Sequence, residues 1–239
     1  MNFCSINRKI FLDTETTGMN KTGNLCINHK IIEIGAIEMI NRKLTGKKIH
    51  FYLKPGRLID PEAYKIHGIS NQFLSKKPFF YEVSQKILNF LKNSTIIVHN
   101  AIFDISFLNY EFSLISSQIP KLNKICKIVD TLILARKLFP GKKNTLDALC
   151  QRYHINSKNR ILHGALLDAQ LLSKVYLSMT SKQESIFFSP QKNTSYNITY
   201  DYNLENKIIS HIIYATQKET NDHVKYLKNI CNISKKKIW

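Results

Sequence analysis

The sequence has little of what marks a secreted, membrane-spanning or zinc-stabilised protein. Its 239 residues include five cysteines, which are scattered and form no Cys-x-x-Cys pair, so neither a disulfide framework nor a zinc site is indicated. No apolar stretch approaches the roughly 18 residues that a membrane span needs, and the first residues show no export signal. We therefore expect a cytoplasmic protein with no membrane partner.

Acidic residues are also scarce. Lysine and arginine total 35 against 17 aspartates and glutamates, which gives a formal charge of +18, and such an excess favours a polyanionic partner such as nucleic acid. Only six of the 35 basic residues are arginine, while lysine, asparagine and isoleucine abound, as a compositional bias of the coding DNA would produce. The charge supports a nucleic-acid partner, and the compositional explanation stays open.

The order of strand-like and helix-like segments predicts an α/β fold. Three strand-like runs come first, at 9–13, 30–40 and 49–55, and their short links favour antiparallel pairing of neighbours. Helices and strands then alternate, which is typical of a mixed central sheet flanked by helices. The later expected elements are a short helix opened by Asp60-Pro61 and ended by Gly68, a helix through 83–91, a strand at 95–100, a helix from Phe103, a strand at 127–130, a helix capped by Thr145 and an apolar helix at 164–178.

Composition changes near residue 181. The stretch 189–203 has little apolar content and is typical of a linker, whereas 204–239 regains apolar periodicity before a basic end. Roughly 35 residues are too few for an independent core, so we expect this tail to become ordered against a partner. The predicted organisation is a main domain at 1–181, a linker at 182–203 and a tail at 204–239.

Two acids follow an apolar run in "FLDTETTG", residues 11–18. Side chains alternate between the two faces of a strand, so Asp13 and Glu15 would point the same way. Two neighbouring carboxylates repel and raise each other's pKa unless a cation neutralises them, and oxygen ligands suit a hard divalent ion such as Mg²⁺ or Mn²⁺. The alternative is that one acid is exposed at the strand end while the other caps a turn.

Three further residues strengthen the metal hypothesis. Asp104 follows a buried strand at an apolar helix start, where an unpaired carboxylate is costly, although it could instead be an N-cap. Asp168 lies on a largely apolar helix, so it needs a metal or an arginine unless it faces solvent. His163 would lie some 140° away on that helix, because five residues turn about 100° each. A loop position ahead of the helix would make it a candidate general base, or an ordinary loop histidine.

The motifs "FLDTETTG", "VHNAIFDISF" and "LHGALLDAQ" resemble those of the DEDDh family of 3′ to 5′ exonucleases, which is named for four acids and a histidine. The matching positions are Asp13, Glu15, Asp104, His163 and Asp168. The resemblance implies a ribonuclease-H-like fold and two metal ions, held by Asp13, Glu15 and Asp168, with Asp104 supporting the second ion directly or through water. Such ions lie about 3.5 to 4 Å apart and clamp the attacking and leaving oxygens of the scissile phosphate.

A longer resemblance covers most of the main domain. The stretches "HKIIEIGAIE", "YLKPGRLIDPEAYKIHGIS" and "LDALCQRY" are similar to the family of proofreading epsilon subunits of bacterial DNA polymerase III. The likeness implies removal of mismatched 3′-terminal nucleotides from DNA as 5′-monophosphates by an exonuclease domain at 1–181. It also implies that Glu62 and His67 contact the terminal nucleotide. Alternatively, both residues have only structural roles, with Glu62 as a capping-type residue in a first helical turn and His67 packed before Gly68.

The same resemblance implies protein partners besides a single-stranded DNA 3′ end. Weaker likeness in "IIYATQKETNDHVKYL" and at Trp239 implies that the tail docks on the polymerase alpha subunit, and a small theta subunit is a further candidate. The residues "QESIFF", Gln183 to Phe188, are spaced like a sliding-clamp-binding peptide. Neighbouring phenylalanines that are exposed in a linker also need a partner. Those phenylalanines could instead fold back on the domain.

Two alternatives retain the same motifs. An RNA exonuclease would share the acids, but it would not require the tail or the clamp peptide. A scaffold without catalysis would only stabilise a polymerase, yet degenerate sites usually lose a ligand and here none is missing. Phe103 and Phe107 could wedge against bases, but an aromatic stripe at helical spacing is more often core, and we expect them there.

Overall fold

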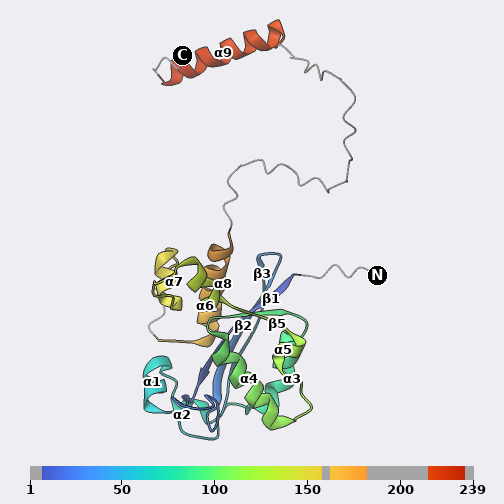
Figure 1. Ribbon diagram of the computed structural model, residues 1–239, viewed down its shortest axis with the longest axis vertical. Coiled ribbons are helices and arrows are strands. Elements are labelled where there is room, and N and C mark those ends of the chain that lie inside the picture. Colours follow the sequence, from blue (N-terminus) through green and yellow to red (C-terminus); the bar gives the residue numbers. More distant parts are fainter. Residues whose placement is uncertain (1–6, 158–161, 182–214, 235–239) are drawn as a thin grey trace, which may run out of the picture. The chain divides into compact units, whose positions relative to one another are not determined.

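The computed structural model describes residues 7–157, 162–181 and 215–234. The chain divides into two compact units, Met1–Ser185 and Ile186–Trp239. The first contains a five-stranded sheet with helices on both faces (Figure 1). In the second, the described element is the helix α9, Gln217–Ser234. Within the described residues, no helix combines the length and apolar character that crossing a bilayer requires.

The sheet has the strand order β3-β2-β1-β4-β5. β1 (Arg8–Thr16), β2 (Ile31–Ile40) and β3 (Lys43–Tyr52) pair antiparallel in sequence order. β4 (Thr95–Val98) and β5 (Lys127–Asp130) continue the sheet from β1 in parallel. The predicted mixed sheet is therefore confirmed, and the carboxyl ends of β1, β4 and β5 meet at one end of it, where ligands bind in open α/β sheets.

The third strand begins earlier than the sequence indicated. β3 starts at Lys43 and not at 49. The sequence did not indicate this start because the largely polar stretch 43–48 has no apolar period. Asn41 and Arg42 have φ values of 49° and 64°, which is the left-handed geometry of a two-residue hairpin turn. This turn joins β2 directly to β3.

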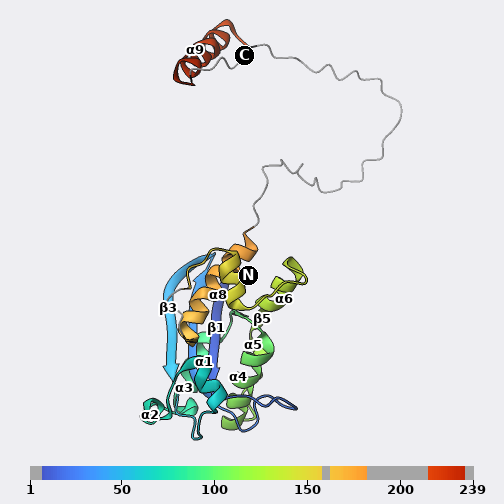
Figure 2. The ribbon, with the colours of Figure 1, turned by 90° about the vertical axis from the view of Figure 1, so that its left-hand side faces the viewer.

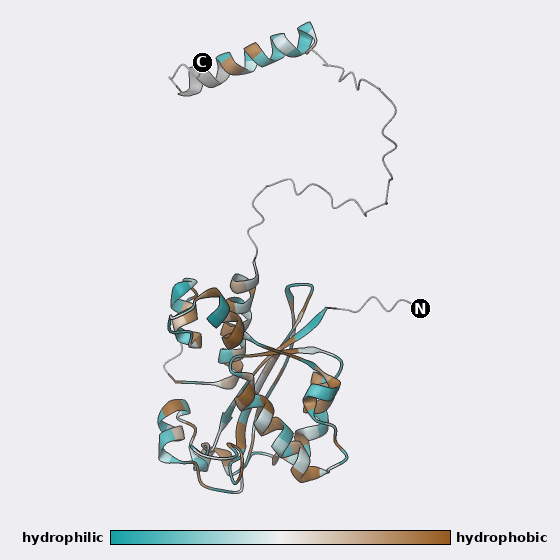
Figure 3. Cartoon of the chain, viewed as in Figure 1, coloured by the Kyte–Doolittle hydropathy of each residue, from teal (hydrophilic) through white to brown (hydrophobic). Residues whose placement is uncertain are grey.

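The helices α3 (Phe80–Leu91) and α4 (Ala101–Ile115) pack on one face of the sheet. The predicted stripe of α3 is buried against alternate residues of β1, and Figure 3 shows apolar residues running through the sheet between the helices. Fully buried members of this cluster include Ile10, Leu12, Ile87, Leu91 and Phe107.

The helices α7 (Leu146–Arg152) and α8 (Ala165–Thr180) cover the opposite face. Phe11 lies between two residues of the first cluster and points the other way, against Tyr176 of α8, as the alternation of a strand requires. Figures 1 and 2 show α8 running along the strands. Thr145 caps α7 as predicted, because its hydroxyl accepts the N–H of Ala148 at 3.3 Å.

The shorter helices were only partly predicted. α1 (Pro61–His67) begins after Asp60 and ends at Gly68 in the left-handed conformation, as expected. Three helices were missed: α2 (Asn71–Leu74), α5 (Leu122–Ile125) and α6 (Thr131–Leu138). α2 and α5 are single turns, too short to show a period, and α6 follows β5 with no intervening loop to announce it.

Candidate active site

β1 carries the first two acids at its carboxyl end. The strand extends to Thr16, beyond the predicted end at 13, so both acids lie inside it. Asp13 pairs with Gly35 of β2, and Glu15 pairs with Glu33. Residues two apart share a face of a strand, so Asp13 and Glu15 point the same way, and Glu15 is buried.

Gly35 lets α8 approach the sheet beside these acids. A Cβ added at Gly35 would meet the backbone nitrogen of Leu166 at 2.2 Å and the carbonyl carbon of Ala165 at 2.4 Å. Asp168 lies in the first turn of α8 and is 2% exposed, so the alternative of a solvent-facing acid is wrong. The close approach of backbones brings this buried acid next to the strand that pairs with β1.

Glu15, His163 and Asp168 come together at this point. Each residue offers one ligand atom, and these atoms all lie within 4.8 Å of one another. His163 Nδ1 is 3.5 Å from Asp168 Oδ2, and 44% of the histidine side chain is exposed. The carboxylate oxygens of Glu15 and Asp168 are ligands that fit a hard divalent ion such as Mg²⁺ or Mn²⁺.

His163 lies in a loop ahead of α8, as predicted. Its backbone N–H donates to the carbonyl oxygen of Ile66 at 3.1 Å. A Cβ added at Gly68 would meet Leu162 Cδ1 at 2.5 Å, so the loop also packs against the end of α1. α1 therefore connects His163 to the predicted nucleotide-binding residues.

Asp104 lies in the first turn of α4 and is 3% exposed. Its Oδ1 accepts a hydrogen bond of 2.7 Å from the hydroxyl of Thr14, the residue between Asp13 and Glu15. Burial raises the pKa of Asp104 to about 7, although the Thr14 hydrogen bond opposes that rise. Asn100 precedes α4, so Asp104 is not its N-cap. The group of three ligand atoms includes neither Asp104 nor Asp13, and Thr14 links Asp104 to the strand that carries the β1 acids.

A cavity of about 190 Å³ lies beside the acids. Glu15 opens onto it, and so do Glu62 and His67, the two residues predicted to contact a nucleotide. The exposed carboxylate of Glu62 pairs with Lys21 Nζ at 3.4 Å. The remaining lining residues are Thr16, Gly18, Met19, Lys21, Asp60, Ala63, Ile66 and Phe103.

His67 presents a buried nitrogen at this cavity. Its Nδ1 accepts the N–H of Ile69 at 3.0 Å, so the neutral ring carries its proton on Nε2. Burial lowers the pKa of His67, against a smaller opposing effect of the Thr16 carbonyl. Among the described residues, Nε2 makes no hydrogen bond of good geometry. A buried N–H that has no such hydrogen bond and lies beside a cavity is suited to donate to a ligand.

Sequence reasoning missed part of the cavity wall. Met19 directly follows "TETTG" and Lys21 comes two residues later, so their nearness to the motif was a usable signal, whereas nothing marked Ile66. Phe107 is fully buried, as predicted. Phe103 packs against the core and also lines the cavity, so one aromatic of the predicted pair borders the site.

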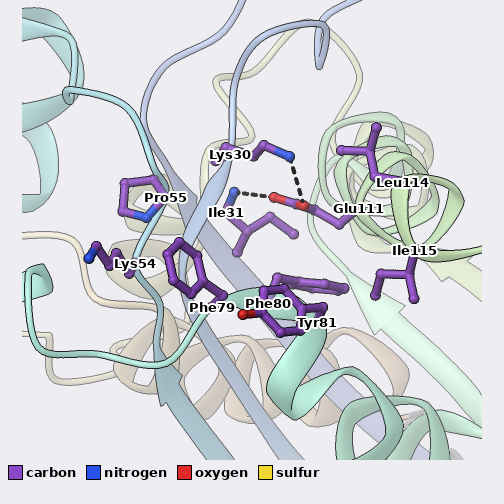
Figure 4. Close-up of a pocket in the computed structure, with 10 residues that line it drawn as sticks. All are labelled: Lys30, Ile31, Lys54, Pro55, Phe79, Phe80, Tyr81, Glu111, Leu114 and Ile115. Carbon is purple, nitrogen blue, oxygen red and sulfur yellow. Dashed lines mark hydrogen bonds and ion pairs between the residues drawn. The ribbon is translucent and has the colours of Figure 1, made fainter.

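A second cavity, of about 420 Å³, lies near the start of β2, lined also by residues of α3 and α4 (Figure 4). Glu111 is buried in its wall, where the carboxylate accepts Lys30 Nζ at 3.3 Å and the N–H of Ile31 at 3.1 Å. Burial raises the pKa of Glu111, and Lys30 opposes the shift. These contacts tie α4 to β2, so Glu111 has a structural role.

Comparison with known proteins agrees with the motifs. Residues 10–176 match the RNase_T exonuclease family. The chain is 53% identical over 224 residues to DNA polymerase III subunit epsilon of Buchnera aphidicola subsp. Schizaphis graminum, covering 92% of this chain and 96% of that protein. It is 55% identical over 190 residues to the same subunit of Escherichia coli K12, covering 80% and 78%. The chain belongs to the DNA polymerase III epsilon-subunit family.

Solved structures resemble this epsilon-family exonuclease in fold. Exonuclease X in complex with 5′-overhanging duplex DNA has 26% identity and a TM-score of 0.53, covering 72% of this chain and 89% of that one. The nuclease domain of 3′hExo, a DEDDh family member bound to rAMP, has 16% identity and a TM-score of 0.59, covering 74% and 92%. The ribonuclease-H-like fold is confirmed, and the family assignment makes the chain a metal-dependent 3′ to 5′ exonuclease.

Proposed function

We propose that this epsilon-family exonuclease proofreads DNA synthesis by removing mismatched 3′-terminal nucleotides as 5′-monophosphates. The observation that carries the proposal is the convergence of Glu15, His163 and Asp168 beside the cavity that Glu62 and His67 help to form. A cluster able to hold metal ions thereby adjoins a cavity with a donor, an acceptor and an apolar wall. Hydrolysis of a terminal nucleotide needs both a metal cluster and an adjoining cavity that holds the nucleotide.

We assign the metal ligands from the same cluster. Asp13, Glu15 and Asp168 would hold two divalent ions, Mg²⁺ or Mn²⁺, and Asp104 would support the second directly or through water. All four donors are carboxylates, which suit these hard ions. When bound, the ions supply positive charge at the attacking and leaving oxygens of the phosphate. The burial of Glu15 and Asp168 limits screening of that charge by water.

His163 is the proposed general base. Its Nδ1 faces Asp168 Oδ2 at 3.5 Å, and the ring is partly exposed, so a water molecule can reach Nε2. Nε2 then takes a proton from the attacking water, while Asp168 stabilises the imidazolium that forms. The hydrogen bond from the backbone of His163 to Ile66 steadies the loop during this step.

Glu62 and His67 are proposed to bind the terminal nucleotide. The Glu62 carboxylate would accept from the 3′-hydroxyl side of the sugar, and its exposed ion pair with Lys21 is weak enough to give way. The buried Nε2–H of His67 would donate to the same nucleotide. Ala63, Ile66 and Phe103 form an apolar wall that suits the base.

Selectivity for mismatches would come from fraying and not from reading the wrong base. A mismatched end unpairs at lower cost than a paired one. A site that accepts a single unpaired nucleotide therefore acts faster on mispaired ends. The same energetics apply whichever base is wrong.

The tail is proposed to attach the 1–181 exonuclease domain to the polymerase alpha subunit through 204–239, across a linker at 182–203. Within α9, the large apolar side chains of Val224 and Tyr226 are exposed, and exposed apolar side chains suit contact with a partner. The clamp-binding prediction at 183–188 and the terminal Trp239 lie outside the described residues. Association with a theta subunit and a cytoplasmic location remain part of the proposal.

A primer-end assay on the full-length chain tests the function. The substrates are DNA with a paired or a mispaired 3′ end and an RNA strand of matching sequence, each with Mg²⁺, Mn²⁺ or chelator. We expect metal-dependent release of 5′-monophosphates, fastest from the mispaired DNA end. Equal or faster cleavage of RNA would support the RNA-exonuclease alternative.

Two variants test the metal ligands. Asp13→Ala and Glu15→Gln are expected to lower kcat by about 10²-fold or more and to abolish the rise in Tm that Mn²⁺ gives the wild type. Asp147→Asn is the matched control, because it neutralises an exposed acid in the first turn of α7. Full nuclease activity in Asp13→Ala would instead revive the scaffold alternative.

A further inference from the structure

Asp130 connects two helices through one carboxylate. It is the last residue of β5 and the N-cap of α6, where its Oδ1 accepts the N–H of Leu132 at 2.8 Å. The same Oδ1 accepts the N–H of Asn100 at 3.1 Å, and Oδ2 accepts the N–H of Ala101 at 3.0 Å. Two of its three backbone donors therefore belong to the start of α4, which lies about 30 residues earlier in the chain.

α4 depends on this carboxylate because the side chain of its own N-cap residue accepts no hydrogen bond from the helix. Asn100 precedes the helix with φ of 74°, and its side chain makes no capping hydrogen bond. Asparagine tolerates a left-handed backbone better than most residues other than glycine, but the first N–H groups of a helix need acceptors from outside it. Asp130 supplies those acceptors, and its negative charge is favourable at a helix N-terminus.

The start of α4 in turn fixes Asp104. Asp104 lies three residues after Ala101, within the first turn, and its Oδ1 accepts the Thr14 hydroxyl at 2.7 Å. A shift or fraying of that turn would move the buried carboxylate away from β1. The path from Asp130 through the start of α4 to Asp104 therefore joins β5 to the strand of the catalytic acids.

His99 holds the same junction from the end of β4. Its Nε2 donates to the carbonyl oxygen of Asn144 at 2.9 Å, and its Nδ1 lies 2.9 Å from the hydroxyl of Thr131. Thr131 is fully buried and directly follows Asp130. The carboxylate of Asp130 is thereby presented from a backbone segment that is already fixed.

We propose that Asp130 is a positioning residue of the exonuclease site, whose carboxylate holds the start of α4 so that Asp104 lies where the second divalent ion binds. The inference rests on the proposed function, because it takes Asp104 as a ligand of that ion. Asp130 acts through Asp104 and is not itself assigned to the ions or the substrate.

The variant Asp130→Ser separates the two capping roles of Asp130. Serine is a good N-cap and can keep the bond to Leu132, but its side chain is too short to serve Asn100 and Ala101 as well. Thr145→Ala is the matched control, because it removes an N-cap hydrogen bond from α7, which packs on the other face of the sheet. Asp130→Asn preserves shape while replacing one acceptor oxygen with a donor.

Calorimetric titration of Mn²⁺ into the full-length proteins tests the proposal, together with Tm and amide exchange of the metal-free forms. We expect Asp130→Ser and Asp130→Asn to weaken the second Mn²⁺ by about 10- to 100-fold, with faster exchange at the amides of Asn100 and Ala101. The half-saturating Mn²⁺ concentration for activity should rise in parallel, and kcat should recover in part at high Mn²⁺. Thr145→Ala should lower Tm and leave Mn²⁺ affinity unchanged.

Two results would overturn the inference, and they are distinguishable. If the wild type binds two Mn²⁺ ions and both Asp130 variants bind them as tightly, Asp130 does not position Asp104, while the proposed function stands. If the wild type binds no Mn²⁺, the metal site and the role of Asp130 both fail. Should Asp130→Ser not fold, the isosteric Asp130→Asn decides the matter alone.

Discussion

Asp104 holds its proton more tightly than an ordinary aspartate, because burial raises its pKa from 3.8 to about 7 in the metal-free protein. Between those values the folded chain binds more protons than the unfolded chain. The free energy of unfolding therefore falls as pH rises through this window, and the contribution of Asp104 is lost above pH 7. A divalent ion that needs the ionised carboxylate must displace this proton at lower pH.

We expect Mn²⁺ binding to release close to one proton from Asp104 at about pH 6 and much less at about pH 8.5. Calorimetry in two buffers of different ionisation enthalpy measures that number. The Tm of the metal-free protein should fall between about pH 4 and pH 7, and Asp104→Asn should reduce both effects. An unchanged proton count in Asp104→Asn would assign the proton to another group.

The residues of the site differ in how far the sequence could predict them. Asp13 and Glu15 could be placed on one face because a strand has a period of two. His163 could be placed in a loop because, on a helix, it would lie on a different face from Asp168. Those inferences needed only local rules. Ile66 borders the cavity because α1 folds against the 162–164 loop, which is a tertiary contact that no local pattern encodes.

At the scale of elements, Gly35 sets the distance between α8 and the sheet. The atoms that a new Cβ would meet, at 2.2 to 2.4 Å, belong to the backbone at Ala165 and Leu166, which cannot rotate away. Gly35→Ala should therefore push the first turn of α8 outward and carry Asp168 with it. We expect a loss of about 1–3 kcal/mol in unfolding free energy and a fall in kcat of about 10²-fold.

Gly46→Ala is the matched control for that substitution. Gly46 lies on β3 with φ of 83° and no atom within 4 Å of an added Cβ, so alanine there is strained but meets nothing. It should cost about 1 kcal/mol and leave kcat unchanged. Urea unfolding and single-turnover cleavage measure the two quantities, and equal kcat in both variants would show that α8 tolerates the new methyl group.

The elements that the sequence predicted carry their signal within themselves, as a repeat of apolar residues or, for α1 and α7, as capping residues. The stripe of α3 is complete within the helix, so its packing face could be predicted directly. β3 starts among polar residues because the hairpin turn at Asn41 and Arg42 and the pairing with β2 hold it. α6 begins directly at the capping residue that ends β5, so a strand signal masked its start.

For the whole molecule, the formal charge of +18 has two explanations that the sequence left open, contact with nucleic acid and compositional bias. The salt dependence of DNA binding separates them. If lysines contact the DNA backbone, affinity falls with salt, with a slope of about −0.7 for each phosphate neutralised on a single strand. Four such contacts would weaken binding about 50-fold between 50 and 200 mM salt. Anisotropy of a labelled single strand in chelator measures this, with an uncharged methylphosphonate strand as control, and a flat salt response would assign the lysine excess to compositional bias.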